Sequence, residues 1–230
     1  MTPHQAWNKI GLVTSVTTTA PGERVLSTPA RRALILGPPL VVAIYEIFHP
    51  NPDVTAAAVM DVAGWFALFH AIQLVLFTLL ALSIALLAQN LGVFGHWVTR
   101  MGLVLVLVFF SAYDAIAGIA TGLAMRAARD LPVAEQNAVF EVVKDWPGTE
   151  PAVFAIGAVA VVGMVLALAM LTIGARRLQV GRGPVILLAL ATIVALGGHP
   201  FPFGTVAFGC LFLAALWLEW IGYRGETAES

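Results

Sequence analysis

Long runs of apolar residues, broken by only a few polar side chains, fill most of the chain. Six such runs lie at residues 33–48, 62–88, 101–125, 152–174, 184–198 and 201–222. A bilayer core about 30 Å thick needs about 20 apolar helical residues, and backbone in lipid must satisfy its own hydrogen bonds. The first and fifth runs are the weaker candidates, because one contains Gly37-Pro38-Pro39 and the other is short and ends in Gly197-Gly198. We expect an all-α, polytopic integral membrane protein, with one six-helix transmembrane domain over residues 31–223.

The composition agrees with this pattern. Hydrophobic residues make up 60% of the chain and charged residues 11%, against about 45–50% and about 25% in an ordinary soluble domain. The net charge of −1 excludes a basic nucleic-acid binder, and the hydrophobicity excludes a disordered protein. The single cysteine, Cys210, excludes an intramolecular disulfide and a multi-cysteine metal site.

The distribution of lysine and arginine predicts the orientation. Six crossings place nine of these residues on one side and three on the other, and the richer side is expected to face the cytoplasm. The nine are Lys9, Arg24, Arg31, Arg32, Arg100, Arg176, Arg177, Arg182 and Arg224; the three are Arg126, Arg129 and Lys144. We therefore expect both termini in the cytoplasm of a bacterial inner membrane protein. Residues 1–30 are predicted to be a largely disordered cytoplasmic tail and residues 224–230 a second tail.

One long outer loop, residues 126–151, contains a further helical pattern. Pro132 suits a helix start, Val139, Phe140 and Val143 lie near helical spacing, and Pro147-Gly148 would end the segment. This pattern predicts a short amphipathic helix at the outer interface. It would serve either as a lid over a site or as a plain connector.

Ionisable residues inside the spans are the main candidates for function, because burying them in lipid is costly. Glu46, His49, His70, Asp114 and His199 all fall in the predicted outer half of the membrane or at its mouth. Two other acids receive structural interpretations. Asp61 would cap the second helix, and Glu219, between Trp217 and Trp220, would form an ion pair in an interfacial aromatic belt.

Helical spacing predicts which side chains share a face with these candidates. Phe66, Gln73 and Phe77 fall on the face of His70, and Phe110, Ser111, Gly118 and Thr121 fall on the face of Asp114. Such polar and aromatic stripes suit a pocket rather than lipid. Gly118-x-x-x-Gly122 and the Ala/Gly-rich fourth span predict close helix packing, either within the chain or in a homo-oligomer.

The favoured interpretation is an enzyme whose pocket opens to the outer leaflet. A desolvated carboxyl keeps its proton and can protonate a double bond or an epoxide, and aromatic faces can stabilise the resulting cation. The substrate would be a lipid or isoprenoid-like molecule undergoing proton-initiated cyclisation or isomerisation, with no cofactor required. The candidate catalytic residues are Asp114, Glu46, His70, His199 and Tyr113. The candidate substrate-binding residues are Tyr45, Phe66, Phe69, Gln73, Phe110 and Phe201.

Three alternatives remain open. Glu46-x-x-His49 has the spacing of carboxylate–histidine metal sites in helical bundles, and with His70 and His199 it would hold a divalent metal such as zinc or iron. A membrane-embedded aspartate beside histidines also suits a proton-coupled transporter of small molecules, although the polar groups do not continue to the inner side. A structural subunit with polar interhelical contacts is the last alternative.

Overall fold

The computed structural model describes residues 28–50, 55–146, 150–200 and 202–222, and 88% of these residues are helical, with no strand among them. The predicted all-α class is therefore confirmed. The elements in chain order are α1 (Thr28–Tyr45) with η1 (Glu46–Phe48), α2 (Ala56–Asn90), α3 (Trp97–Leu105), η2 (Val106–Phe110), α4 (Ser111–Tyr113), η3 (Asp114–Ala120), α5 (Thr121–Ala127), η4 (Ala128–Asp130), α6 (Val133–Val143), α7 (Pro151–Arg177), α8 (Arg182–Val194) with η5 (Ala195–Gly197), and α9 (Phe203–Trp217) with η6 (Leu218–Gly222).

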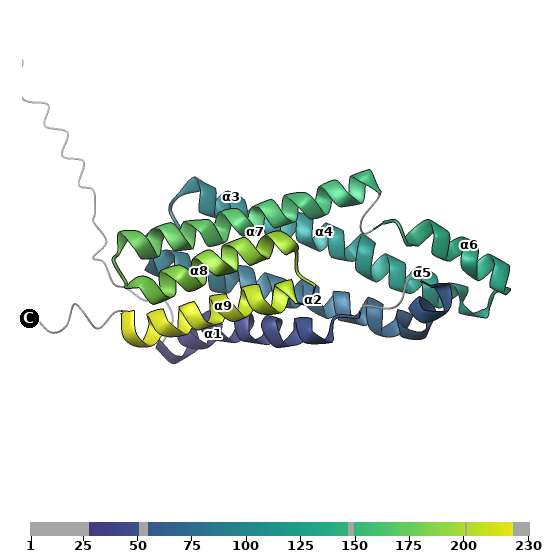
Figure 1. The fold of residues 1–230 in the computed structure, drawn as a ribbon, viewed down its shortest axis with the longest axis horizontal. Helices are drawn as coiled ribbons and strands as arrows, with labels where there is room; N and C mark the ends of the chain where they lie inside the picture. Colours follow the sequence, from purple (N-terminus) through teal and green to yellow (C-terminus); the bar gives the residue numbers. More distant parts are fainter. Residues whose placement is uncertain (1–27, 51–54, 147–149, 201, 223–230) are drawn as a thin grey trace, which may run out of the picture.

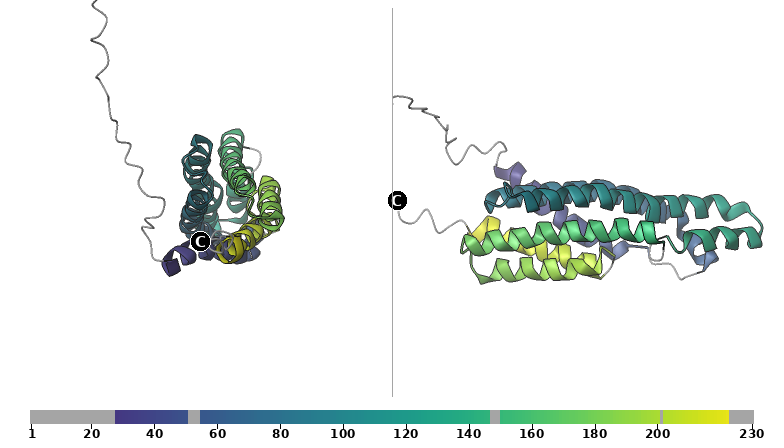
Figure 2. Two further views of the ribbon diagram at one scale, coloured as in Figure 1. Left: turned by 90° about the vertical axis from the view of Figure 1, so that its left-hand side faces the viewer. Right: turned by 90° about the horizontal axis from the view of Figure 1, so that it is seen from above.

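All of these elements except α6 belong to six helical rods that pack in a closed ring (Figures 1 and 2). The segments from α3 to η4 run on without interruption, and we call this continuous stretch, Trp97–Asp130, the third rod. Going round the ring, α1 packs on α2, α2 on the third rod, the third rod on α7, α7 on α8, α8 on α9, and α9 on α1. Residues that point inward from opposite rods therefore meet near the axis of the ring.

Four of the rods are long and apolar enough to cross a membrane. They are Ala56–Asn90, Trp97–Asp130, Pro151–Arg177 and Phe203–Trp220. The fifth apolar rod, Arg182–Gly197, is shorter, and α1 carries two arginines in its first turns and Pro38-Pro39 in its middle. By length and composition, these four rods are candidate membrane-spanning helices. The two rods left over are the two that the sequence marks as weaker.

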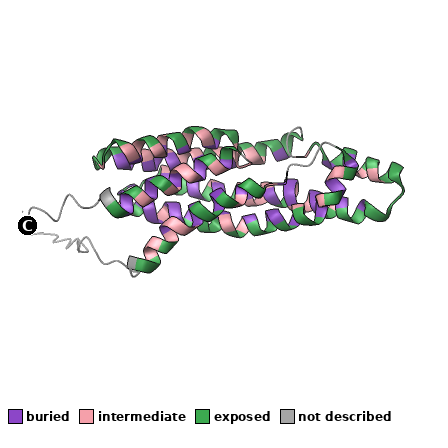
Figure 3. Ribbon diagram, turned by 60° about the horizontal axis from the view of Figure 1, so that its bottom comes forward, coloured by how far each residue is buried: buried purple, intermediate pink, exposed green. Residues whose placement is uncertain are grey.

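The outer surface of the bundle differs from that of a soluble helical protein, although its interior is likewise mainly apolar. Buried and exposed residues alternate along each helix, so that each helix has a buried and an exposed side (Figure 3). The exposed surface of the rods carries large apolar side chains, such as Ile44, Val75, Val108, Val162, Ile193 and Leu213. Several polar side chains are instead buried inside, including Glu46, His70, Gln73 and Asp114. A surface of this kind is compatible with lipid rather than with water.

Two of the rods extend beyond the others. At about 1.5 Å per residue, α2 is about 52 Å long and the third rod about 51 Å, while α1 is about 27 Å. Their overhanging ends carry α6 (Figure 1), which packs on α2 and α5 through Met60, Met125, Phe140 and Val143. The predicted helix in the outer loop is confirmed, with Pro132 directly before it. Its main contacts are with α2, α5 and η4, which form the overhang.

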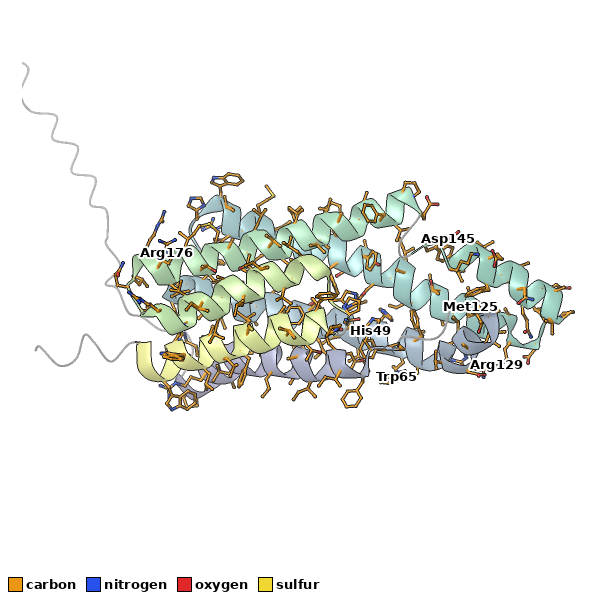
Figure 4. All side chains as sticks on the ribbon, viewed as in Figure 1. His49, Trp65, Met125, Arg129, Asp145 and Arg176 are labelled. Atoms are coloured by element: carbon orange, nitrogen blue, oxygen red, sulfur yellow. The ribbon has the colours of Figure 1, made fainter. Side chains whose placement is uncertain are left out.

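Charged residues divide the molecule into two ends. Arg31 Nη1 lies 3.4 Å and Arg32 Nε 3.7 Å from the carboxylate of Glu219, and Asn90 Nδ2 donates to the same carboxylate at 3.0 Å. The predicted ion pair of Glu219 is confirmed, with α1 as the partner element. These contacts place the start of α1 and the end of α9 at one end, the arginine-rich end. Arg176 lies there too, and Arg129 lies at the opposite end (Figure 4).

Two sequence interpretations need correction at the helix ends. Asp61 does not cap α2, because the helix begins at Ala56 and Thr55 Oγ1 accepts from Ala58 N at 3.2 Å. Residues 28–30, assigned to the N-terminal tail, are the first residues of α1. The rest of that tail and residues 224–230 lie outside the described residues. The predicted break at Gly197-Gly198 is confirmed, since η5 ends at Gly197 and Gly198 has φ 85°.

Candidate functional site

Six polar side chains from four places in the chain meet inside the ring, and we call them the polar cluster. They are Glu46 and His49 at the end of α1, His70 and Gln73 on α2, Asp114 on the third rod, and His199 in the α8–α9 connection. His49 lies partway along the molecule, where α1, α8 and α9 end while α2 and the third rod continue (Figure 4). The ends of the short rods thus form the site against the middle of the long rods.

Hydrogen bonds join Glu46, Gln73 and His199. Gln73 Nε2 donates to Glu46 Oε1 at 2.5 Å and lies 3.0 Å from His199 Nδ1. Because an amide nitrogen carries two hydrogens and accepts none, Nδ1 is the acceptor in this pair. Neutral His199 therefore carries its proton on Nε2. The second carboxylate oxygen of Glu46 lies 3.5 Å from Nδ1, so both a carboxyl and an amide face the same ring nitrogen.

Asp114 lies on the other side of the His199 ring. Its Oδ1 is 4.0 Å from His199 Nε2, and the residue is fully buried. Neither carboxyl oxygen has a hydrogen-bond partner among the described residues. Of the face predicted for Asp114, Phe110, Gly118 and Thr121 are buried, whereas Ser111 is only partly buried. His199 is therefore flanked by two carboxyl groups, one near each ring nitrogen.

The backbone around Asp114 departs from a regular α-helix. Two π-helical segments, η2 (Val106–Phe110) and η3 (Asp114–Ala120), flank the single turn Ser111–Tyr113. Each widens the turn and shifts which side chains face inward, and π-bulges are frequent at functional sites. Thr121 Oγ1 donates to Ile116 O at 3.4 Å, five residues back. Asp114 therefore opens a locally rearranged stretch of helix.

His49 and His70 complete the cluster. Their rings meet edge-on with centroids 5.3 Å apart, and the His49 ring is also 5.3 Å from that of His199. His70 Nδ1 lies 2.8 Å from Phe66 O, so this nitrogen carries the proton and Nε2 keeps a free lone pair. Neither nitrogen of His49 has a hydrogen-bond partner in the described part of the chain.

Glycines let the rods approach the cluster closely. A Cβ on Gly118 would lie 2.1 Å from His70 Cγ, and one on Gly204 would lie 1.7 Å from His199 O. A Cβ on Gly122 would lie 2.7 Å from the backbone of Ala67 on α2. The Gly118-x-x-x-Gly122 pair therefore packs within the chain, and a homo-oligomer stays a prediction.

A cavity of about 540 Å³ adjoins the cluster at His199. It lies between the third rod, α7 and the α8–α9 connection, and its wall is mainly aromatic and aliphatic. Phe77, Phe110, Tyr113, Phe154, Phe208 and His199 are among the lining residues. Phe154, Val162 and Leu196 also line it and are exposed on the outside of the rods. The cavity therefore reaches the apolar surface of the bundle.

The predicted site residues fall into two groups. His199, Tyr113 and Phe110 line the cavity. Asp114 and Glu46 do not line it and instead lie beside the two ring nitrogens of His199. Tyr45 and Phe69 stack with centroids 4.1 Å apart, and Tyr45 donates to Phe69 O at 3.0 Å. These two rings, Phe66 and Gln73 do not line the cavity and instead surround the histidines and Glu46. Phe201 lies outside the described residues.

Two cavity-lining aromatic residues, Phe154 on α7 and Phe208 on α9, were not identified from the sequence. Phe77, which the sequence placed on the face of His70, also lines the cavity and stacks on Phe110 with centroids 3.8 Å apart. Gly157 is the signal that points to this wall, because a Cβ there would lie 2.8 Å from the Tyr113 ring. Sequence spacing relates Phe154 to Gly157 on one face of α7, but it does not show which rod they meet.

Comparison of the chain with protein-family models, with curated proteins and with solved structures found no match. The function is therefore inferred from the site itself.

Proposed function

We propose that this protein is a membrane-embedded enzyme that moves protons on a hydrophobic, lipid or isoprenoid-like substrate. The observation that carries the proposal is the position of His199, whose ring belongs to the polar cluster and also to the cavity wall. An apolar cavity with a few convergent polar groups is the usual form of a small-molecule site. Isomerisation or cyclisation started by a proton fits these groups best.

The proposal includes six crossings with both termini in the cytoplasm. The arginine-rich end carries Arg100, Arg176, Arg177 and Arg182 besides the two arginines of α1, and cytoplasmic flanks are rich in such residues. Asn90 marks this end of α2 through its bond to Glu219. His70 lies roughly 20 residues before Asn90, which is about 30 Å of helix and about one hydrocarbon thickness. The site then lies near the outer boundary of the hydrocarbon core, within the outer half of the membrane that the sequence predicts for these residues.

Substrate access is expected to be lateral. Phe154, Val162 and Leu196 are exposed where the cavity reaches the lipid-compatible surface. A molecule with a long apolar chain can enter there from the outer leaflet without crossing water. The α6 helix is then a connector or a cap of the overhang, since its packing partners are α2 and α5.

The chemistry is a proton relay through the imidazole of His199. The Nε2 proton forms a new C–H bond on one carbon of a substrate double bond, while Nδ1 takes a proton from the Glu46 carboxyl 3.5 Å away. The adjacent carbon of the substrate becomes a cation. Loss of a neighbouring C–H proton to Nε2, with return of the Nδ1 proton to Glu46, gives the isomer and restores the site. The carboxyl oxygen of Asp114, 4.0 Å from Nε2, is placed to stabilise the positive charge that develops.

Deuterium incorporation tests this proposal. The purified protein is incubated in deuterated water with isoprenoid lipids extracted from the expression host, and products are read by mass spectrometry. We expect lipid isomers that contain solvent deuterium. His199→Gln and Glu46→Gln should lower their formation by about 10²–10⁴-fold, the usual contribution of general acid–base catalysis.

His96→Gln is the matched control. His96 caps α3 at the arginine-rich end and takes no part in the polar cluster, so this variant should label lipid at the wild-type rate. Absence of deuterium in every lipid, together with proton-driven uptake in liposomes, would instead favour the transporter. Equal labelling by His199→Gln and wild type would remove His199 from the chemistry.

A further inference from the structure

Three members of the polar cluster present donor atoms to one point. One donor atom each from Glu46, His49 and His199 lies within 4.8 Å of the other two. Three points no more than 4.8 Å apart all lie within about 2.8 Å of a common point, and zinc binds nitrogen and oxygen at about 2.0–2.2 Å. Each donor atom would therefore have to move by no more than about 0.8 Å to reach the length of a zinc–ligand bond.

The spacing of one donor pair is already that of a metal site. Glu46 Oε2 and His199 Nδ1 are 3.5 Å apart, and two ligands of a tetrahedral zinc ion are about 3.4 Å apart when both bonds are about 2.1 Å. Glu46 and His49 are held together by η1, whose three residues per turn align side chains three apart. The local backbone therefore sets the first two ligands.

Two of the three candidate ligands, Glu46 and His49, have buried polar atoms without a partner. Glu46 is fully buried, yet its Oε2 has no hydrogen-bond partner among the described residues, and the same holds for both nitrogens of His49. An unpartnered buried polar group costs about 1–3 kcal/mol. A cation bound by Glu46 Oε2 and one nitrogen of His49 would give both of these atoms a partner. The Nδ1 atom of His199 would complete the set by exchanging its hydrogen bond from Gln73 for the ion.

We propose that Glu46, His49 and His199 bind a divalent transition-metal ion of the zinc or iron(II) class. Two imidazoles and one carboxylate form a ligand set typical of catalytic zinc, in which a fourth position stays open. His70, which the sequence included in the metal set, is not part of this group of donors. Its ring packs edge-on against that of His49 and holds it in place.

This inference concerns the same site as the proposed function but is tested without it. The ion would take the position of the proton between Glu46 and Nδ1, and Nε2 of His199 would keep its proton toward Asp114 and the cavity. A substitution of His49 distinguishes the metal site from the proton relay. His49 is a ligand of the ion, whereas the proton relay does not use it.

The test is cobalt binding by the full-length protein in detergent, stripped with a chelator and then reloaded with Co²⁺. Elemental analysis should find about one ion per chain in wild type and in His96→Gln. Glu46→Gln and His49→Gln should bind at least tenfold more weakly, and the visible absorption of four-coordinate cobalt should disappear. Added Co²⁺ should raise the melting temperature of wild type and of His96→Gln, but not that of His49→Gln.

Two results would overturn the metal site. One is wild-type protein that retains no more cobalt than Glu46→Gln. The other is a His49→Gln variant that folds, judged by its metal-free melting temperature, and binds cobalt as tightly as wild type. If the protein labels lipid with deuterium but binds no cobalt, the proposed function is supported and the metal site is wrong. If it binds cobalt but labels no lipid, the metal site is supported and the proposed function is wrong.

Discussion

The carboxyl groups of Glu46 and Asp114 are buried where they lower the stability of the folded protein. Both residues are fully buried, and three of their four oxygens have no hydrogen-bond partner among the described residues. Each such atom costs about 1–3 kcal/mol, whereas an apolar residue of similar volume would cost nothing of this kind. Groups kept at such a cost are expected at functional sites, where activity and stability compete.

Asp114 allows this argument to be tested by stability. Asp114→Asn keeps the shape of the side chain and replaces one neutral, unpartnered polar group by another, so the melting temperature should equal that of wild type. Thr99→Val is the contrast, because the buried Thr99 hydroxyl donates to Val93 O at 2.8 Å. Its loss should cost about 1 kcal/mol and lower the melting temperature. An Asp114→Asn variant less stable than Thr99→Val would show that the carboxyl is a structural group.

The helices of this protein end or change type where the site lies. Glu46 lies in the 3₁₀ turn that follows α1, Asp114 opens a π segment, and His199 follows the turn at Gly198. The long apolar helices hold the bundle together, and these local irregularities aim the polar side chains. Changes to the irregular turns should therefore affect the site more than equal changes elsewhere on the same helix.

Apolar periodicity predicted the rods and the inward direction of the polar residues, because both depend on which face avoids lipid. The break at Gly197-Gly198 was also predictable, since glycine accepts the φ of 85° that the turn needs. The π segments around Asp114 were not, because a slipped hydrogen bond leaves the apolar pattern nearly unchanged. The cavity was not predictable either, because it depends on which rods become neighbours in the ring.

Gly204 and Gly209 on α9 test whether a change beside an irregular turn affects the site more than the same change elsewhere on the helix. A Cβ on Gly204 would lie 1.7 Å from His199 O, which is backbone, while one on Gly209 meets nothing within 4 Å. Gly204→Ala should lower stability by about 1–3 kcal/mol through overpacking and should displace His199, reducing deuterium incorporation. Gly209→Ala should raise stability by up to about 1 kcal/mol, because alanine favours a helix. Thermal unfolding and the labelling assay measure both effects, and equal behaviour of the two variants would contradict the close contact.

The molecule as a whole combines a closed ring with an overhang at one end. The ring presents apolar side chains outward over its length, whereas the overhang carries exposed acids such as Asp61, Glu135 and Glu141 around α6. Arginines gather at the opposite end, where they hold Glu219. This separation of charge suits a protein whose arginine-rich end faces the cytoplasm and whose overhang extends beyond the outer surface.

Cysteine labelling tests this orientation. In a Cys210→Ser background, Ala57→Cys places an exposed thiol on the overhang, and Leu178→Cys places one beyond α7 at the arginine-rich end. Three rods separate the two positions, α2, the third rod and α7, so the thiols should lie on opposite sides of the membrane. In right-side-out vesicles, an impermeant maleimide should label Ala57→Cys at once and Leu178→Cys only after permeabilisation. An N-terminal epitope should be protected in the same way as Leu178→Cys, because α1 adds one crossing before the overhang. Labelling of both thiols from one side would contradict the crossing of these three rods, and an epitope accessible from outside would remove α1 from the crossings and leave the N-terminus outside.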